Sequence, residues 1–593
     1  MSTLDLFPIG NCQVSALIDR EGRFVWGCVP RVDGDPVFSA LVGGEEPDAG
    51  FWAIELENSA KIDQRYVRNT PILITRHTDT LGNAIEVIDF CPRFRRMGRS
   101  YRPVAFARIV RPVAGSPRIR VKLRPTSDWG RPCAEQIGAS NHIRFALNAM
   151  TLRLTTSAPT GMIEEERLFR VERPLHFFLG PDESFAGNLA ATLDQMLADT
   201  TDEWQEWVRS LAIPLEWQDV VIRSAITLKL CQHEETGAIV AALTTSIPEH
   251  KGSERNWDYR FCWIRDAYYT VQALNRLGAL DVLEGYLGYL RNIVDSAAGG
   301  HIQPLYGVLG EATLEERVAP DLPGYRGMGP VRVGNQAYEQ IQHDAYGQIV
   351  LCSVHAFFDT RLYRIGGIED FEALEHVGER AWKHHDEADA GLWELRTRQS
   401  VHTYSSAMCW AACDRLGNAA EKLELPKRAA FWRDRADRIR AEIETKAWRP
   451  DTNRMSATFA GDDLDASLIQ LLDLRFFEPD DPRFLGTLDA VEKGLLRGSY
   501  MLRYDTEDDF GLPETAFNVC TFWLIEALAA TGRGADARDL FEEMLKRRTS
   551  AGLLSEDIDP TSNELWGNYP QTYSLVGMIN CAGILSKPWS SIR

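Results

Sequence analysis

The stretch NLAATLDQMLADTTDEWQEWVRSL, residues 188–211, marks the point where the chain changes from one pattern to another. Its own pattern is helical, and we expect residues 186–212 to form a helical linker between two domains. The chain has 593 residues. Because single cores rarely grow beyond about 250–300 residues, a chain of this length should divide into more than one domain.

On the N-terminal side of this stretch, residues 1–185 read as strands and turns. In PRIRVKLRP (117–125), Ile119, Val121 and Leu123 alternate with basic residues, which is the period of a half-buried strand. The runs FWAIELE, PILITRHTD, NAIEVIDF and MTLRLTT are similar. Short strands separated by Gly, Pro, Asn and Asp predict an antiparallel β-sandwich.

On the C-terminal side, residues 213–593 read as almost wholly helical. Besides helical spacing at 221–228 and 338–352, we expect helices near 257–278, 281–298, 369–385, 403–419, 425–446, 483–497, 515–531, 535–547 and 570–585. About a dozen helices allow six inner and six outer ones, an (α/α)6 barrel, although the pattern alone does not separate this from another helical array.

The composition of the chain limits the kinds of partner that it can bind. The formal net charge is -20, which argues against nucleic acid or an anionic membrane, because both select basic surfaces. The start of the chain lacks the features of a secretory signal, and no apolar run is long enough for a transmembrane helix. The 11 cysteines show no CxxC pair, so we expect reduced thiols in a cytoplasmic protein. A homo-oligomer stays open.

Three segments mix Trp or Tyr with Asp, Glu and Arg, which is how proteins hold sugars: rings pack on C–H faces while charged groups bind hydroxyls. The first, RNWDYRFCWIRDAYYTVQAL (255–274), supplies six candidate substrate contacts: Trp257, Asp258, Arg260, Trp263, Arg265 and Asp266. The structural alternative is a helix N-terminus capped by Asp258. A cap explains one Asp but not two Arg and a second Asp among aromatics.

The second segment, DLPGYRGMGPVRVGNQAYEQIQHDAYG (321–347), is a glycine-rich loop before a helix. Such loops also cradle phosphates, but GMGPVRVG does not match GxxxxGK[ST]. We therefore expect a loop that shapes a sugar pocket, with Arg326, Arg332 and Asn335 as contacts.

The third pair of segments carries two glutamates. GLWELR (391–396) places Glu394 after Trp393, and GLLSEDIDP (552–560) places Glu556 in another Gly- and Pro-bounded loop. Glycoside hydrolysis needs two carboxyl groups, one protonated to assist the leaving oxygen and one ionised. A Glu beside an aromatic in an apolar pocket has a raised pKa, as a general acid requires. On chemistry alone, either Glu is only one of many acidic candidates.

Together these segments resemble glycoside hydrolase family 15, which contains glucoamylases and bacterial trehalases. FPIGNCQVSALIDREGRFVWGCVPRVDGDPVFSALVGG (7–44) resembles the N-terminal β-domain of the trehalase-like members, and WDYRFCWIRDA, GLWELR, GLLSEDIDP and GNYPQTYS (567–574) resemble the family's site motifs. The resemblance implies the (α/α)6 barrel and an inverting mechanism. It implies Glu394 as general acid, Glu556 as general base, and Arg265 and Asp266 as ligands of the non-reducing glucose. Asn568 and Trp393 join the predicted substrate contacts.

The sequence departs from the family at two places. Leu575 stands where members often have His, and GLPETAFNVCTFW (511–523) differs from the usual EGTF-like segment. Both departures affect the side of the pocket that binds the leaving group. The sequence therefore determines the type of reaction better than it determines the substrate.

We expect an exo-acting α-glucoside hydrolase that releases β-glucose, with α,α-trehalose as first choice of small carbohydrate substrate. Malto-oligosaccharide hydrolysis, a phosphorylase and an inactive sugar-binding protein are the alternatives. The 12 His show no metal-site spacing, so the sequence predicts no metal and no cofactor.

Overall fold

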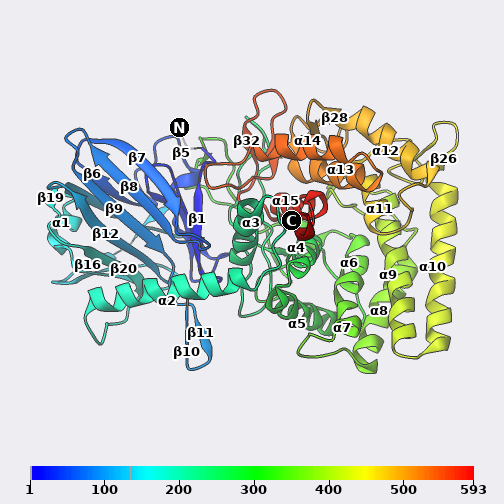
Figure 1. Ribbon diagram of the computed structural model, residues 1–593, viewed down its shortest axis with the longest axis horizontal. Helices are drawn as coiled ribbons and strands as arrows, with labels where there is room; N and C mark the ends of the chain where they lie inside the picture. Colours follow the sequence, from blue (N-terminus) through cyan, green and yellow to red (C-terminus); the bar gives the residue numbers. More distant parts are fainter. Residues whose placement is uncertain (1–2, 134, 593) are drawn as a thin grey trace.

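The computed structural model describes residues 3–133 and 135–592, and it shows a β-domain followed by a helical domain (Figure 1). The β-domain lies at the left of the view in blue and cyan, and the helices fill the right side. The predicted fold class, an antiparallel β-sandwich followed by an (α/α)6 barrel, is confirmed.

Two antiparallel sheets form the sandwich. The first has the order β1-β2-β3-β6-β13-β19, with β4 paired to β3: β1 Phe7–Gly10, β2 Ser15–Ile18, β3 Phe24–Val29, β4 Asp35–Phe38, β6 Phe51–Leu56, β13 Arg118–Arg124 and β19 Phe169–Arg170. The second has the order β16-β17-β18-β20-β12-β9-β8-β7: β7 Ser59–Tyr66, β8 Leu73–Asp79, β9 Ala84–Phe90, β12 Phe106–Ala114, β16 Glu135–Gly138, β17 His142–Ala146, β18 Thr151–Thr156 and β20 Leu175–Pro181.

The inner faces of the sheets meet through aromatic side chains. Phe24 of β3 packs edge-on against Phe106 of β12, with ring centroids 6.0 Å apart, and Trp52 of β6 meets Phe177 of β20 at 6.4 Å. In β13, Ile119 and Val121 are buried while Arg118 is exposed. The alternation read from the sequence therefore places the apolar side chains in the sandwich core and leaves the basic face to solvent.

The long helix α2, Leu189–Arg209, follows the β-domain and runs along its lower edge in Figure 1. Asn188 caps it by accepting a hydrogen bond from the backbone N–H of Ala191 at 3.0 Å. Its inward face buries Leu193 and Trp204, which explains why this stretch is amphipathic.

The remaining helices form two rings. The inner ring is α4 Ile264–Arg276, α6 Asp344–Ser353, α9 Thr403–Lys422, the short pair η3 Ala466–Ile469 and α11 Gln470–Asp473, α13 Asn518–Ala530 and α15 Thr572–Leu585. The outer ring is α3 Gln218–Leu230, α5 Leu280–Ala297, α8 Ile368–His384, α10 Pro426–Lys446, α12 Pro482–Leu495 and α14 Gly534–Leu545. Each inner element contacts the next, and α15 closes the ring against α4.

Two predicted helices begin later than their apolar spacing indicated. The stretch 257–263 is extended, because Asp258 pairs with Thr245 in a β-bridge, and α4 starts only at Ile264. Similarly, a 3-10 turn at Gln336–Glu339 precedes α6, which starts at Asp344. In both places, aromatic residues with helical spacing lie in a loop at the mouth of the barrel.

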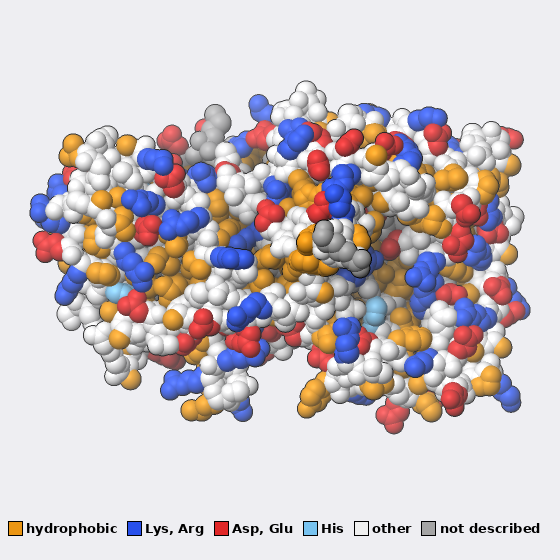
Figure 2. All heavy atoms as spheres, in the orientation of Figure 1, with side chains coloured by type: hydrophobic (Ala, Val, Ile, Leu, Met, Phe, Trp, Pro, Cys, Tyr) orange, Lys and Arg blue, Asp and Glu red, His pale blue; other side chains and the backbone are white. Residues whose placement is uncertain are grey.

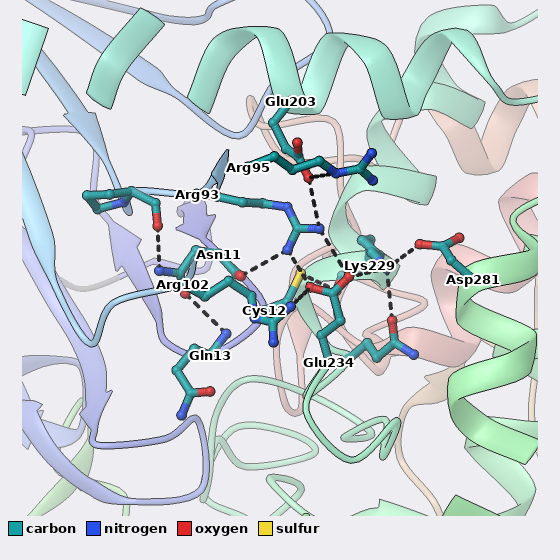
Figure 3. Close-up of polar contacts among 12 residues, drawn as sticks. Asn11, Cys12, Gln13, Arg93, Arg95, Arg102, Glu203, Lys229, Glu234 and Asp281 are labelled. Carbon is teal, nitrogen blue, oxygen red and sulfur yellow. Dashed lines mark hydrogen bonds and ion pairs between the residues drawn. The ribbon is translucent and has the colours of Figure 1, made fainter. Parts of the chain in front are cut away.

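A buried network of charges joins the β-domain to the helices (Figure 3). Glu234 accepts hydrogen bonds from Arg93 at 2.5 Å and from Lys229 at 3.2 Å, and it also pairs with Arg102. Lys229, on α3, reaches Asp281 at 2.7 Å. Since Lys229 is only 1% exposed, its charge depends on these partners, and the network fixes the two domains together.

The surface carries mixed charge. On the face in Figure 2, acidic and basic side chains are interspersed over both domains and do not gather into one basic patch. Among the described residues, no helix is both long and apolar enough to cross a membrane.

Candidate active site

A cavity lies at the end of the barrel where loops lead from outer helices into inner ones. Its wall is built from five of these loops and from the first turns of α4 and α15. The residues that line it are Ala241, Glu249, Arg255, Trp257, Tyr259, Trp263, Arg265, Asp266, Asn335, Ala337, Gln340, Leu392, Trp393, Glu394, Leu395, Arg396, Arg503, Tyr504, Asp508, Asp509, Phe510, Phe517, Glu556, Gln571 and Tyr573.

The first turn of α4 brings Arg265 and Asp266 into this wall. Both are buried, at 7% and 5% exposure. Burial raises the pKa of Asp266 to about 7, although the neighbouring Arg265 acts in the opposite direction. Arg265 donates to Gln342 Oε1 at 3.0 Å, so the guanidinium is held in place from behind.

Glu394 sits in the tight loop before α9. Its backbone adopts φ 62°, which side-chain-bearing residues rarely do and which is typical of strained functional loops. Trp263 Nε1 donates to Glu394 Oε1 at 2.6 Å, and Arg265 donates to the same oxygen at 2.9 Å. Oε1 accepts both of these hydrogen bonds, so Oε2 takes part in neither and can bind a ligand.

Glu556 enters the cavity from the loop before strand β31, Asp557–Ile558. The carboxyl group is 1% exposed and accepts a hydrogen bond from Tyr259 Oη at 2.5 Å. The backbone N–H of Asn568 also donates to it, at 3.3 Å. These contacts fix the orientation of the carboxyl group before any ligand arrives.

Two aromatic residues of one short segment therefore link the two glutamates. Tyr259 bonds Glu556, Trp263 bonds Glu394, and their ring centroids are 5.3 Å apart. The glutamates, which come from loops far apart in the sequence, face one cavity and are held by neighbouring rings.

A general base must be ionised, but the surroundings of Glu556 oppose ionisation of its carboxyl group. Burial raises its pKa well above the usual value, and the nearby carboxyl groups of Asp557 and Glu249 act in the same direction. The bond from Tyr259 and the charge of Arg503 oppose this shift. Glu394 has a different neighbour, since the guanidinium of Arg265 donates to its carboxyl group at 2.9 Å.

The cavity wall also contains residues that the sequence interpretation missed. Glu249 is 4% exposed, pairs with Arg503 and accepts a hydrogen bond from Trp257 Nε1 at 3.2 Å. Arg255 pairs with Asp508 at 2.6 Å. Glu249 lies eight positions before Trp257, and Arg503 lies in a segment that also contains Tyr500, Tyr504 and Phe510. The mixture of aromatic and charged residues in that segment was a signal that the sequence interpretation did not use.

The predicted aromatic contacts reach the cavity. Trp257 stacks under Arg396, whose guanidinium carbon is 4.1 Å from the ring centroid. Trp393 donates to Asp465 Oδ2 at 2.7 Å, which orients its indole ring. Asn335 also lines the cavity, while its amide donates to the backbone carbonyl of Asp258 at 3.3 Å.

Asp258 and Arg260 are predicted as substrate contacts, but the structure corrects this, because neither residue lines the cavity. Both are fully buried and pair with each other at 2.7 Å. Arg260 also donates to the carbonyl of Gly34 at 2.6 Å and stacks over Trp129, so it reaches into the β-domain. Since 257–260 is extended, alternate side chains point to opposite sides: Trp257 and Tyr259 face the cavity, and this pair faces the domain junction.

Three further predicted contacts do not line the cavity. Arg326 pairs with Glu564 at 2.8 Å, and Arg332 pairs with Glu316 at 3.0 Å, so both support the glycine-rich loop from outside. The Asn568 side chain donates to the carbonyl of Trp257, and only its backbone reaches Glu556. Leu575, the departure from the family pattern, is fully buried in α15 and is likewise outside the cavity wall.

Paired carboxyl groups on an aromatic-walled cavity at the mouth of a helical barrel define a glycoside hydrolase. The comparisons agree with this class. The model of "Glycosyl hydrolases family 15" matches residues 217–583, and that of "Trehalase-like, N-terminal" matches residues 5–158. The chain belongs to glycosyl hydrolases family 15.

Named relatives extend over nearly the whole chain. A trehalase from Thermoplasma volcanium is 32% identical, covering 97% of this chain and 92% of its own. A trehalase from Mycobacterium tuberculosis is 31% identical, covering 96% and 88%. The crystal structure of a bacterial glucoamylase complexed with acarbose shares the fold, with a TM-score of 0.67 at 14% identity, covering 98% of this chain and 94% of that one.

Proposed function

We propose that this protein is an inverting, exo-acting α-glucoside hydrolase that cleaves α,α-trehalose and releases β-glucose. The observation that carries the proposal is the convergence of Glu394 and Glu556 on one cavity. Each carboxyl group is oriented by a separate aromatic donor, so each can act on a different face of a bound sugar.

In the proposed mechanism, one glucose unit enters the cavity toward the first turn of α4. Arg265 and Asp266 bind its 4- and 6-hydroxyl groups, while Trp257, Trp263 and Trp393 wall the ring and exclude water. The hydroxyls compete for Arg265 and weaken its contact with Glu394. The contacts with the sugar thus replace the ion pair that Arg265 makes with Glu394 in the free protein.

Glu394 then protonates the glycosidic oxygen as the bond to the anomeric carbon breaks. Glu556 removes a proton from a water molecule that attacks the same carbon from the opposite face, so the configuration inverts. Inversion requires carboxyl groups roughly 6.5–9.5 Å apart, with room for water between them. The two glutamates are held by different rings, Tyr259 and Trp263, whose centroids are 5.3 Å apart, and this arrangement supports a separation of the carboxyl groups.

Trehalose is the proposed substrate because relatives of similar length, matched over both domains, are named trehalases. Malto-oligosaccharide is the second candidate, since a bacterial glucoamylase has the same fold. Glucose release from trehalose, maltose, isomaltose and dextrin should be fastest with trehalose. Trehalose as the poorest of the four would overturn the substrate assignment.

The mechanism is tested by the anomer of freshly released glucose and by two variants. Proton NMR in the first minutes of trehalose hydrolysis should show the β-anomer from the bond that water attacks. Glu394→Gln and Glu556→Gln should each lower kcat by at least about 10³-fold, while trehalose binding measured by calorimetry persists. Full activity in either variant would end that residue's assignment.

We also propose that the enzyme acts in the cytoplasm on a small carbohydrate, with neither nucleic acid nor a membrane as partner. The 11 cysteines are all free, and 10 of them are buried, as expected where thiols stay reduced. A homo-oligomer is compatible with this reading, and the elution volume of the native protein measures it.

A further inference from the structure

Three potential metal ligands meet behind the cavity wall. His343 is the residue before α6, His384 is the last residue of α8, and Glu387 lies in the loop that follows. One ligand atom from each lies within 4.8 Å of the others. The two histidines are 41 positions apart in the sequence, which is why the search for paired His motifs predicted no metal. None of them lines the cavity.

His343 is the unusual member of this group. It is 4% exposed, and neither ring nitrogen makes a hydrogen bond of normal geometry with the described residues, although the backbone of Ala388 lies beside the ring. A buried imidazole normally has at least one partner.

The other two residues complete a donor set. His384 Nδ1 lies 2.6 Å from Glu387 Oε2, so the carboxylate already orients that imidazole. The rings of His343 and His384 are nearly parallel, at 9°, with centroids 5.3 Å apart. Because ring lone pairs lie in the ring plane, a shared ion would sit at the ring edges, with the carboxylate beside it.

We propose that His343, His384 and Glu387 bind one divalent ion of the zinc class, with water as the fourth ligand. Two imidazoles and a carboxylate suit Zn²⁺, whose bonds to such ligands are about 2.0–2.2 Å long. Donor atoms around a tetrahedral ion are then about 3.4 Å apart. Binding the ion therefore requires side-chain rotations that shorten the present spacing, which is within 4.8 Å, to that distance.

The ion would stiffen two loops that hold the candidate acid. The backbone N–H of His343 donates to Asp389 Oδ2 at 2.9 Å, and the preceding Gln342 accepts from Arg265. Gln340 of the same loop donates to the carbonyl of Glu394 at 3.1 Å. By linking the start of α6 to the end of α8, the ion acts on stability and positioning and takes no part in the reaction.

A neighbouring cluster, His385, Asp386 and Glu442, offers similar ligands. There both nitrogens of His385 are in use, one with the carbonyl of Trp382 at 2.6 Å and one with Glu442 at 2.9 Å. This cluster therefore lacks the unpartnered buried imidazole that marks the first one, and it provides the control.

The test uses full-length protein without a polyhistidine tag, stripped with EDTA. Co²⁺ titration followed by visible absorption reports the ligand field, Zn²⁺ competition gives the affinity, and thermal unfolding with and without Zn²⁺ gives the stabilisation. The wild type should bind one ion per chain and show a higher Tm with Zn²⁺. His384→Ala and Glu387→Gln should weaken binding at least tenfold and abolish the Tm shift.

Two matched variants locate the ion. His376→Ala removes an exposed imidazole from the same helix, and Glu442→Gln disables the neighbouring cluster; both should bind Zn²⁺ as the wild type does. No binding by the wild type, equal binding by His384→Ala, or loss of binding in Glu442→Gln would each overturn the proposal. Binding is measured without substrate, so the outcome is independent of the proposed reaction.

Discussion

At the scale of single residues, Glu556 and Asp557 are adjacent in the chain, and both side chains are buried. Burial and the neighbouring carboxyls raise the pKa of both. A general base works only when ionised, so a raised pKa moves the acid limb of kcat/KM above the pH expected for an ordinary glutamate, about 4.3. The environment of Glu556 thus sets the lower pH limit of activity.

Asp557→Asn removes the like charge nearest to Glu556 while keeping the shape of the side chain. The pKa of Glu556 should fall, because one repulsive carboxylate is gone. We expect the acid limb of kcat/KM to move to lower pH by roughly one unit. The pH profile of glucose release measures this shift, and Asp559→Asn, in the same loop, should leave the profile in place.

Tyr259→Phe should move the same limb the other way. The hydroxyl of Tyr259 donates to Glu556 Oε1 and lowers the pKa of that carboxyl group. Without this bond the carboxylate is less stable, so the acid limb rises and kcat falls. Tyr338→Phe, whose hydroxyl bonds Glu339 instead, is the control. A shift of the same sign in Tyr259→Phe and Asp557→Asn would contradict this description of the site.

At the scale of elements, the loop after strand β32, Leu565–Trp566, is shaped by one glycine. Gly567 has φ +73°, and a Cβ there would lie 2.6 Å from Glu556 Cβ and 2.7 Å from Oε2. Only glycine lets this loop pass so close to the candidate base.

Gly567→Ala should therefore displace the Glu556 carboxyl group. We expect kcat to fall by about 10²-fold, because small misplacements of a reacting group cost this much. Gly532→Ala is the matched control, since Gly532 has φ +87° and no atom within 4 Å of a built Cβ. Both variants carry similar backbone strain, so equal kcat values in the two would show that contact with Glu556 is unimportant.

The same scale shows how much the sequence predicts. Strand alternation and helix spacing correctly predict the sandwich and the helical rings, because each depends on neighbours along the chain. They misplace the start of α4, because the aromatic residues of the extended segment 257–263, with Tyr259 and Trp263 four positions apart, imitate a helical face. If 257–261 is taken as extended, its alternation separates these rings from Asp258 and Arg260, which the helical interpretation could not do.

The site was predictable only where chemistry clusters in one segment. Arg265, Asp266 and Glu394 lie in such clusters, and the structure places all three in the cavity wall together with Glu556. Glu249 is isolated in sequence and becomes notable only when the fold buries it against Arg503. The stacking of His343 on His384 likewise depends on two helix ends meeting in space.

At the scale of the whole molecule, the charged network around Glu234 is expected to hold the domains together. Glu234→Gln leaves Lys229 and Arg93 buried with one partner fewer, which should destabilise the protein by about 3–5 kcal/mol. Thermal unfolding at pH 7 measures the loss. Glu235→Gln, at the exposed neighbouring position, should unfold like the wild type.

The network also predicts the sign of a pH effect on stability. Burial alone would raise the pKa of Glu234, but Lys229 and the arginines outweigh it and lower that pKa. Such a group stabilises the fold above its unfolded pKa, about 4.3, and the contribution is lost as pH falls toward its folded pKa. Wild-type Tm should therefore drop more steeply between pH 5 and pH 3 than that of Glu234→Gln, and parallel curves would rule out this role.

The closing of the helical ring by α15 has a consequence for how the protein is made. Helix α15 follows all the other helices of the two rings and packs against α13, α3 and α4, and Gln571 and Tyr573 at its start complete the cavity wall. During synthesis, the β-domain and most helices leave the ribosome while this gap is still open. A nascent chain therefore has no working pocket until α15 has been made and has packed against the other helices.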